Sequence, residues 1–310
     1  MSDKTERFSP RPYLAPRYWP TWLGLGLLRL SALLPYRVLL LLGNGLGRLL
    51  YRLVSSRRHV ARVNIGLCFP ELSEAERERR VKGTFIATAI SVFEGALAWW
   101  AGDARLKRMY RIEGLENLKA AQEGGKGVLL IGGHYTTLEI SGRLLSFHCD
   151  KVQPIYKRAH NRLFNDWMVR SRLKHCDELH LNTDMRRIVR ALKRGGVVWY
   201  APDQDFGRER SVFAPFMGVA TASLTATSGL ARLSGAPVLP FWSERLPGAE
   251  GFLIRIGEPI EPFPGGDEVE DATRINAAIE SQVRRAPEQY FWIHKRFKTR
   301  PPGEPDVYRK

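Results

Sequence analysis

The sequence predicts an α/β fold in which a mixed central sheet is flanked by helices and preceded by an apolar N-terminal helical segment. Beyond residue 100, short apolar runs alternate with helix-like stretches, a pattern typical of layered α/β domains. Apolar residues make up 44% of the chain and charged residues 26%, as in proteins with a folded core. The 310 residues suffice for one sizeable domain and an attached segment.

The net charge points to an anionic partner. Lys and Arg number 48 against 32 Asp and Glu, which gives a formal charge of +16. Residues 1–62 hold 11 of the basic side chains and only two of the acidic ones. The same region carries the apolar runs Trp19–Leu34 and Val38–Leu50. This combination favours an anionic lipid surface over a nucleic acid.

The N-terminal region divides into two parts. Residues 1–17, rich in Pro and Arg, predict a flexible basic lead-in. Residues 18–54 predict a membrane-associated apolar segment that opens with aromatic residues. Its first run is shorter than the roughly 20 residues that span a bilayer and is broken by Arg29 and Pro35. A tilted span, a re-entrant pair, an interfacial helix and a helix of the protein core all fit this pattern.

Residues 55–310 are expected to form the main domain. Ser73 and Glu76 have capping-box spacing, and the apolar pattern after them predicts a helix from about residue 74 to Trp100. A late helix is predicted over Asp271–Arg285. The predicted strands are Gly127–Ile131, Val152–Tyr156, Val197–Tyr200, Val238–Trp242 and Phe252–Ile256. The three cysteines, without a C-x-x-C pair, argue against a disulfide framework or a cysteine zinc site and favour a reducing compartment.

A candidate catalytic pair follows the first predicted strand. Gly132 and Gly133 predict a turn that allows close approach of a substrate, with a helix beginning near His134. This places His134 at the carboxyl end of a strand, where open α/β sheets bind ligands. Glu139 could accept the Nδ1 proton of His134 and leave Nε2 free as a general base. A histidine that only caps a helix or packs in the core is the alternative.

Two further clusters follow later strands. Basic residues over Tyr156–Lys174 predict either a phosphate or carboxylate clamp or a solvated basic face. Asp203 and Asp205 could orient a substrate or the basic clamp, or could close the strand in an Asx turn. The further oxygen ligands of a Mg²⁺ site are missing from the pattern. No Walker, dinucleotide or G-x-S-x-G motif is present, so neither a metal nor a nucleotide cofactor is expected.

Several ordered motifs run along almost the whole chain: Pro16–Gly24, Asn64–Pro70, Gly133–Glu139, Val198–Gly207, Ser211–Phe213 and Ala286–Pro301. Together they resemble the late (secondary) acyltransferases of lipid A biosynthesis, of the lauroyl/myristoyl type, within the lysophospholipid acyltransferase superfamily. The resemblance implies a glycerol-phosphate-acyltransferase-like fold. It also implies a bacterial inner-membrane enzyme whose catalytic domain faces the cytoplasm.

The implied reaction belongs to lipopolysaccharide biosynthesis. A fatty acyl chain, lauroyl or myristoyl, passes from acyl carrier protein to a hydroxyl of a 3-hydroxyacyl chain on an anionic, Kdo-bearing lipid A precursor. The acyl-carrier-protein thioester is a co-substrate, and no cofactor, metal or nucleic acid takes part. Inner-membrane phospholipid is the further partner.

The resemblance also assigns roles to residues. His134 and Glu139 match the family's catalytic pair. The family's basic block reads Tyr-Arg with a downstream Asn, whereas this chain has Tyr156-Lys157-Arg158 and Asn161, so either Lys157 or Arg158 takes the arginine's place. The residues expected to bind substrate are Lys157, Arg158, Asn161, Arg172, Asp203 and Asp205.

Two rival functions remain at this point. The same His/Glu chemistry could acylate another lipid, such as a lysophospholipid or a phosphatidylinositol mannoside. The chain could also be a basic, membrane-attached or nucleic-acid-binding protein without catalysis. The second rival lacks a zinc-finger, RRM or helix-turn-helix signature.

Overall fold

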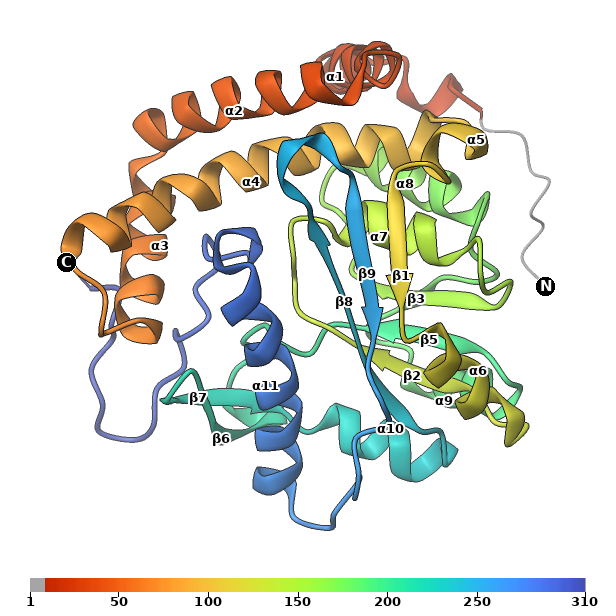
Figure 1. Ribbon diagram of the computed structural model, residues 1–310, viewed down its shortest axis with the longest axis vertical. Helices are drawn as coiled ribbons and strands as arrows, with labels where there is room; N and C mark the ends of the chain where they lie inside the picture. Colours follow the sequence, from red (N-terminus) through yellow and green to blue (C-terminus); the bar gives the residue numbers. More distant parts are fainter. Residues whose placement is uncertain (1–8, 310) are drawn as a thin grey trace.

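A central sheet of seven strands organises the protein in a computed structural model that describes residues 9–309 (Figure 1). The strand order is β1-β9-β8-β2-β5-β3-β4, and only the β8–β9 pair is antiparallel. The strands are β1 (Tyr110–Glu113), β2 (Val128–Ile131), β3 (Val152–Tyr156), β4 (His180–Leu181), β5 (Val197–Tyr200), β8 (Val238–Arg245) and β9 (Phe252–Ile256).

The predicted mixed sheet and all five predicted strands are confirmed. Strand β1, the two-residue β4 and the separate hairpin of β6 (Ser211–Phe216) and β7 (Val219–Leu224) were not predicted from the sequence. Strand β4 is too short for an alternating pattern to develop, and Pro215 interrupts β6.

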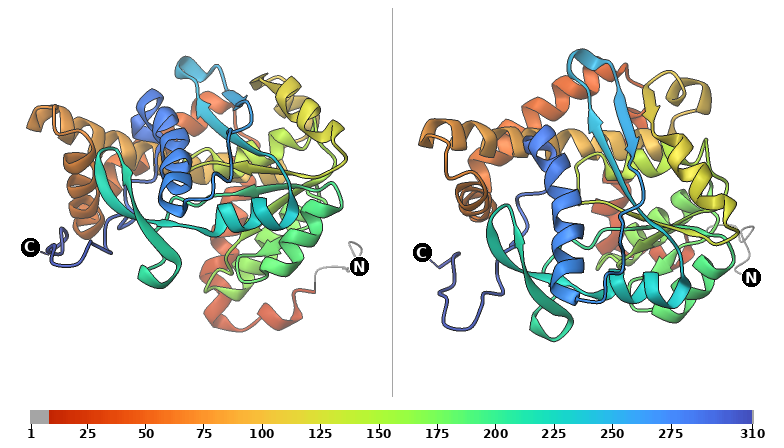
Figure 2. Two further views of the ribbon diagram at one scale, coloured as in Figure 1. Left: turned by 90° about the horizontal axis from the view of Figure 1, so that it is seen from below. Right: turned by 60° about the horizontal axis from the view of Figure 1, so that its bottom comes forward.

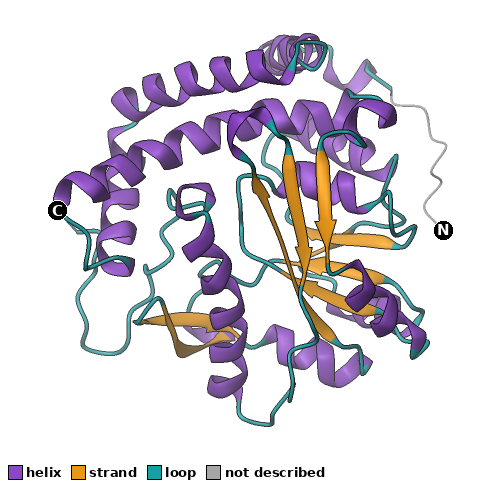
Figure 3. Cartoon of the chain, in the orientation of Figure 1, coloured by secondary structure: helices purple, strands orange, loops and turns teal. Residues whose placement is uncertain are grey.

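Both faces of the sheet are covered by helices (Figure 3), which explains why β2 is apolar at every position. Val128 and Leu130 enter one core, whereas Leu129 and Ile131 enter the other. The first core receives α1 (Trp19–Ser31), the end of α4 (Glu74–Trp100), α7 (Leu138–Leu145) and α8 (Arg162–Leu173). The second receives α3 (Ser55–Cys68), α9 (Met185–Lys193), α10 (Ala226–Ser234) and α11 (Glu268–Arg285). Figure 2 shows the β6–β7 hairpin beside α11. Helices α5 (Asp103–Leu106) and α6 (Leu115–Glu123) flank β1 in the chain.

The predicted capping box begins helix α4. The Ser73 hydroxyl accepts a hydrogen bond from the Glu76 backbone N–H at 3.3 Å, and the Glu76 carboxylate accepts one from the Ser73 backbone N–H at 2.9 Å. Helix α4 therefore begins and ends where the sequence predicted.

Helix α2 (Tyr36–Leu53) lies along α4 at very short range. A Cβ atom at Gly47 would be 2.4 Å from Ile86 Cα, and one at Gly43 would be 2.8 Å from Ile90 Cα. Small residues four positions apart allow two helix backbones to approach in this way. The apolar N-terminal segment is thus packed onto the domain along its length.

The apolar segment predicted over residues 18–54 is helical and consists of two helices. It forms α1 and α2, which are separated at Pro35. Among the described residues, α4 alone is long and apolar enough to cross a membrane by itself, and 56% of its apolar window is buried in the fold. Helices α2 and α3 pass the same test only as a pair bent by 95°.

Residues 1–8 of the predicted lead-in lie outside the described residues. The part that is described forms short 3₁₀ turns at Arg11–Tyr13 and Pro16–Tyr18. Tyr13 is buried, its hydroxyl donates to Asp166 in α8, and its carbonyl oxygen accepts from the Trp22 indole.

Candidate active site

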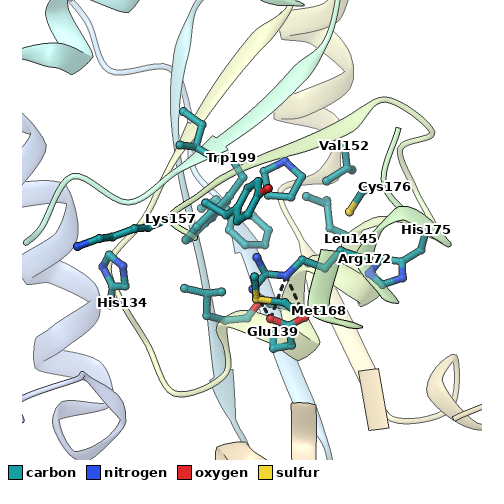
Figure 4. A pocket seen from close by; sticks show the side chains of 17 residues that line it. His134, Glu139, Leu145, Val152, Lys157, Met168, Arg172, His175, Cys176 and Trp199 are labelled. Atoms are coloured by element: carbon teal, nitrogen blue, oxygen red, sulfur yellow. Dashed lines mark hydrogen bonds and ion pairs between the residues drawn. The ribbon is translucent and has the colours of Figure 1, made fainter. Parts of the chain in front are cut away.

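A cavity of about 250 Å³ lies between β3, α7 and α8 (Figure 4). Its wall is mostly apolar, with contributions from Leu145, Val152, Met168, Cys176 and Phe241. The polar groups that border it include His134, Glu139, Lys157, Arg172 and His175. An apolar space with a few convergent polar groups is the usual form of a small-molecule or acyl-chain site.

His134 reaches this cavity from the loop after β2, at the carboxyl end of the central strands. The helix predicted to begin near His134 begins at Leu138 instead. The C-terminal region holds the intervening loop: His134 O accepts from Phe291 N at 3.0 Å, and Thr136 N donates to Gln289 O at 2.8 Å. Backbone bonds to residues 289–291 thus replace the first helical turn.

Gly132 is also required by the packing of the sheet. A Cβ atom at Gly132 would lie 2.4 Å from the Phe241 carbonyl oxygen on the adjacent strand β8. Only glycine lets the two backbones come this close.

Asp203, not Glu139, is the partner of His134. The His134 Nδ1 atom lies 2.5 Å from Asp203 Oδ1, and the His134 backbone N–H donates to Asp203 Oδ2 at 2.7 Å. Asp203 is 2% exposed. The expected hydrogen bond from the His134 ring to Glu139 is therefore wrong, because strand β5 delivers a carboxylate to the same side of the loop.

Glu139 pairs with Arg172 of α8 instead. Arg172 Nε lies 3.1 Å from Glu139 Oε1 and 3.2 Å from Oε2, and Arg172 Nη2 donates to Oε2. The Trp99 indole N–H at the end of α4 donates to Oε1 at 2.7 Å. Both carboxylate oxygens are thus occupied, and three helices meet at one ion pair on the cavity wall.

Both carboxylates are held in the ionised form. Burial alone would raise the pKa of Glu139, but the charge and hydrogen bonds of Arg172 outweigh burial and lower it. Burial would likewise raise the pKa of Asp203, but the His134 imidazole outweighs it and lowers the pKa from 3.8 to about 2. Neither group can act as a general acid near neutral pH.

The predicted basic cluster is only partly assembled at the cavity. Lys157 and His134 both line the cavity, whereas Arg158 does not; Lys157 and Arg158 are both exposed. Asn161 caps α8: its side-chain oxygen accepts from Phe164 N at 3.0 Å, and its amide donates to Thr21 of α1 at 2.7 Å. Asn161 therefore joins the N-terminal segment to the domain.

Asp205 forms the Asx turn that was one of the two roles expected for Asp203 and Asp205. Its carboxylate accepts from Gly207 N at 2.9 Å, from Thr299 N at 2.7 Å and from the Thr299 hydroxyl at 2.9 Å. It does not line the cavity. Asp205 thus ties the C-terminal tail to the loop that carries Asp203.

The three cysteines Cys68, Cys149 and Cys176 are buried and free. Within residues 9–309, no group of three or more His, Cys, Asp or Glu side chains is placed to hold a metal ion. Trp99 and His175 were not predicted as site residues, because neither carries a spacing signal for its place beside Glu139 or the cavity.

A histidine held by a buried carboxylate beside an apolar cavity, at the carboxyl ends of parallel strands, is a general-base site suited to acyl transfer. Residues 6–299 match the sequence profile of the bacterial lipid A biosynthesis acyltransferases. The chain belongs to this family and is an acyltransferase of lipid A biosynthesis.

Curated relatives agree with this family. The chain is 41% identical to a lipid A biosynthesis palmitoleoyltransferase of Escherichia coli (strain K12), over 96% of this chain and 97% of the relative. It is 40% identical to a lipid A biosynthesis lauroyltransferase of the same organism, over 95% and 96%. A lipid A biosynthesis acyltransferase of Haemophilus influenzae is 34% identical over 99% of both chains.

Proposed function

We propose that this protein transfers a fatty acyl chain from acyl carrier protein to a hydroxyl of a 3-hydroxyacyl chain on a Kdo-bearing lipid A precursor. The single observation that supports this most is the juxtaposition of His134 with the apolar cavity lined by Leu145, Val152 and Met168. A fatty acyl chain fits an apolar cavity, and the histidine at its border supplies a base for an alcohol nucleophile.

The reaction needs one proton to move twice. Nε2 of neutral His134 takes the proton of the acceptor hydroxyl as its oxygen attacks the thioester carbonyl. The C–O bond forms, the C–S bond breaks, and the imidazolium returns the proton to the departing thiolate. His134 Nε2 has no hydrogen-bond partner within residues 9–309, and the side chain is 31% exposed.

Lys157 is the proposed cation of the substrate site. It lines the same cavity as His134, so its ammonium group is available to a lipid phosphate or to a developing oxyanion. Arg172, whose charge is taken up by Glu139, is proposed to shape the wall rather than bind an anion.

The proposed location is the bacterial inner membrane, with the catalytic domain on the cytoplasmic face. Exposed leucines cover one side of α1, and others follow on α2: Leu23, Leu27 and Leu30, then Leu41, Leu49 and Leu53. A helix that buries one face on the protein and exposes Leu on the other suits a membrane surface.

Mass spectrometry with competing acceptors tests the proposal. Purified protein receives acyl carrier protein thioesters of several lengths and three acceptors: a Kdo-bearing tetra-acyl lipid A precursor, a lysophospholipid and a phosphatidylinositol mannoside. We expect the lipid A precursor to gain the mass of one acyl chain and the other two to stay unchanged. Preferential acylation of either competitor would replace the acceptor in the proposal.

A further inference from the structure

Both oxygens of the Asp203 carboxylate form hydrogen bonds with His134. Oδ2 accepts the His134 backbone N–H at 2.7 Å, and Oδ1 lies 2.5 Å from ring atom Nδ1. The backbone bond fixes the loop relative to strand β5, and the ring bond fixes the rotation of the imidazole. An ionised carboxylate only accepts hydrogen bonds, so Nδ1 must carry the proton.

Glu139 cannot accept a hydrogen bond from the His134 ring in this arrangement. Its carboxylate accepts from Arg172 and from the Trp99 indole at both oxygens. Turning Glu139 toward His134 would leave the Arg172 guanidinium, whose side chain is 15% exposed, without a partner. The desolvation cost of a buried unpaired cation opposes that rotation.

We infer that Asp203 is the positioning residue of the proposed acyl transfer: it holds the tautomer of His134 with the proton on Nδ1 and leaves the Nε2 lone pair to accept the acceptor-hydroxyl proton. This inference rests on the proposed function, since it names the group that prepares the base. It gives Asp203 a role through His134 and not through contact with the substrate.

The substitution Asp203→Asn tests the inference. Its side-chain oxygen can keep the backbone bond to His134, but its NH₂ group donates to Nδ1 and moves the ring proton to Nε2. An imidazole protonated at Nε2 cannot accept the hydroxyl proton. We expect kcat to fall by about 10²- to 10⁴-fold with KM little changed, by analogy with a catalytic triad that loses its aspartate charge.

Asp271→Asn is the matched control. Asp271 is also a fully buried carboxylate that accepts from a backbone N–H, Gly265 N at 2.7 Å, but it lies on α11 outside the cavity. We expect this variant to keep kcat within about threefold of wild type, so that loss of a buried carboxylate is separated from loss of the His134 partner. Thermal unfolding of both variants reports whether they fold.

The tautomer itself is measured by ¹⁵N NMR of histidine-labelled protein, which needs no substrate. We expect the His134 ring to carry its proton on Nδ1 in wild type and in Glu139→Gln, and on Nε2 in Asp203→Asn. An Nε2–H tautomer in the wild-type protein would overturn the inference. So would an Asp203→Asn variant with wild-type turnover. If wild type acylates no lipid A precursor but shows the Nδ1–H tautomer, the proposed function fails while the Asp203–His134 assignment stands.

Discussion

His134 and Glu139 lie in one segment of the chain, whereas Arg172 and Asp203 come from two others, and the pairing of these four side chains decides what each can do. The sequence identified all four, because each follows a strand or lies on a helix at the sheet edge. It could not assign the pairs. Spacing within one segment suggested Glu139 as the partner of His134, whereas a residue 69 positions away in the chain holds that place.

The Glu139–Arg172 ion pair is expected to matter for stability as well as for the cavity wall. In Arg172→Met the Glu139 carboxylate keeps only the Trp99 hydrogen bond, so the free energy of unfolding should fall by about 3–5 kcal/mol. The double variant Glu139→Gln/Arg172→Met removes both charges and should recover much of this loss. Chemical denaturation checks both values. An equal loss in the two variants would show that the charges are not coupled.

Two half-buried histidines make the protein sensitive to mild acid. Burial lowers the pKa of both His175 and His294 from 6.5 to about 4. The unfolded chain therefore binds more protons than the folded one between pH 6.5 and 4, and the free energy of unfolding should fall across this window as the pH falls.

Denaturant titrations at pH 7, 5.5 and 4.5 measure this slope. The double variant His175→Gln/His294→Gln should reduce it, because the substituted side chains do not titrate, while His148 and His180, whose pKa values burial also lowers, keep the remainder. Glu139 and Asp203, whose pKa values are lowered, stay ionised in the folded protein, so they add to the loss once the pH falls to about the pKa values of the unfolded chain, 4.5 and 3.8. A slope that the double variant leaves unchanged would contradict the assignment to these histidines.

At the scale of elements, helices and strands with a regular apolar pattern could be predicted from the sequence. Loops held by hydrogen bonds to distant segments could not. The capping box and apolar spacing defined α4, and β3, β5 and β9 have their predicted bounds. The helix expected at His134 begins later because backbone bonds to residues 289–291 compete with it. These competing hydrogen bonds come from the C-terminal region of the chain, so the local apolar pattern around His134 cannot predict them.

The close contact of α2 with α4 gives a sharp test at this scale. Gly47→Ala places a methyl group 2.4 Å from Ile86 Cα, so the two helices must separate. We expect a loss of about 1–3 kcal/mol in the free energy of unfolding. Gly45→Ala on the same helix meets no atom within 4 Å and should stabilise by up to about 1 kcal/mol. Equal effects at the two positions in denaturation experiments would refute close packing at Gly47.

At the scale of the whole molecule, the N-terminal region combines an excess of basic residues with exposed apolar side chains. The sequence located the apolar segment but not its arrangement, because whether a Leu faces α4 or the outside depends on tertiary packing. Leu25 is 4% exposed, while Leu23 and Leu27 on the opposite side of α1 are 66% and 58% exposed. The exposed leucines are therefore available to a membrane without disturbing the core.

Replacing Leu23, Leu27 and Leu30 with Ser should weaken binding to anionic lipid vesicles at least about tenfold, since each buried Leu contributes roughly 1.5–3 kcal/mol. Vesicle sedimentation measures the bound fraction. Replacing three exposed apolar residues on other helices, Met185, Leu233 and Val269, with Ser is the matched control and should leave binding unchanged. Comparable losses in the two triple variants would point to a different membrane face.

The most direct test of the whole account compares wild type with His134→Ala in the transfer of an acyl chain from acyl carrier protein to the Kdo-bearing lipid A precursor. We predict that wild type adds one acyl chain and that the variant, folded by its melting profile, is slower by about 10²- to 10⁴-fold. Turnover by His134→Ala close to that of wild type would contradict the account, since it would remove the base on which the proposed chemistry depends.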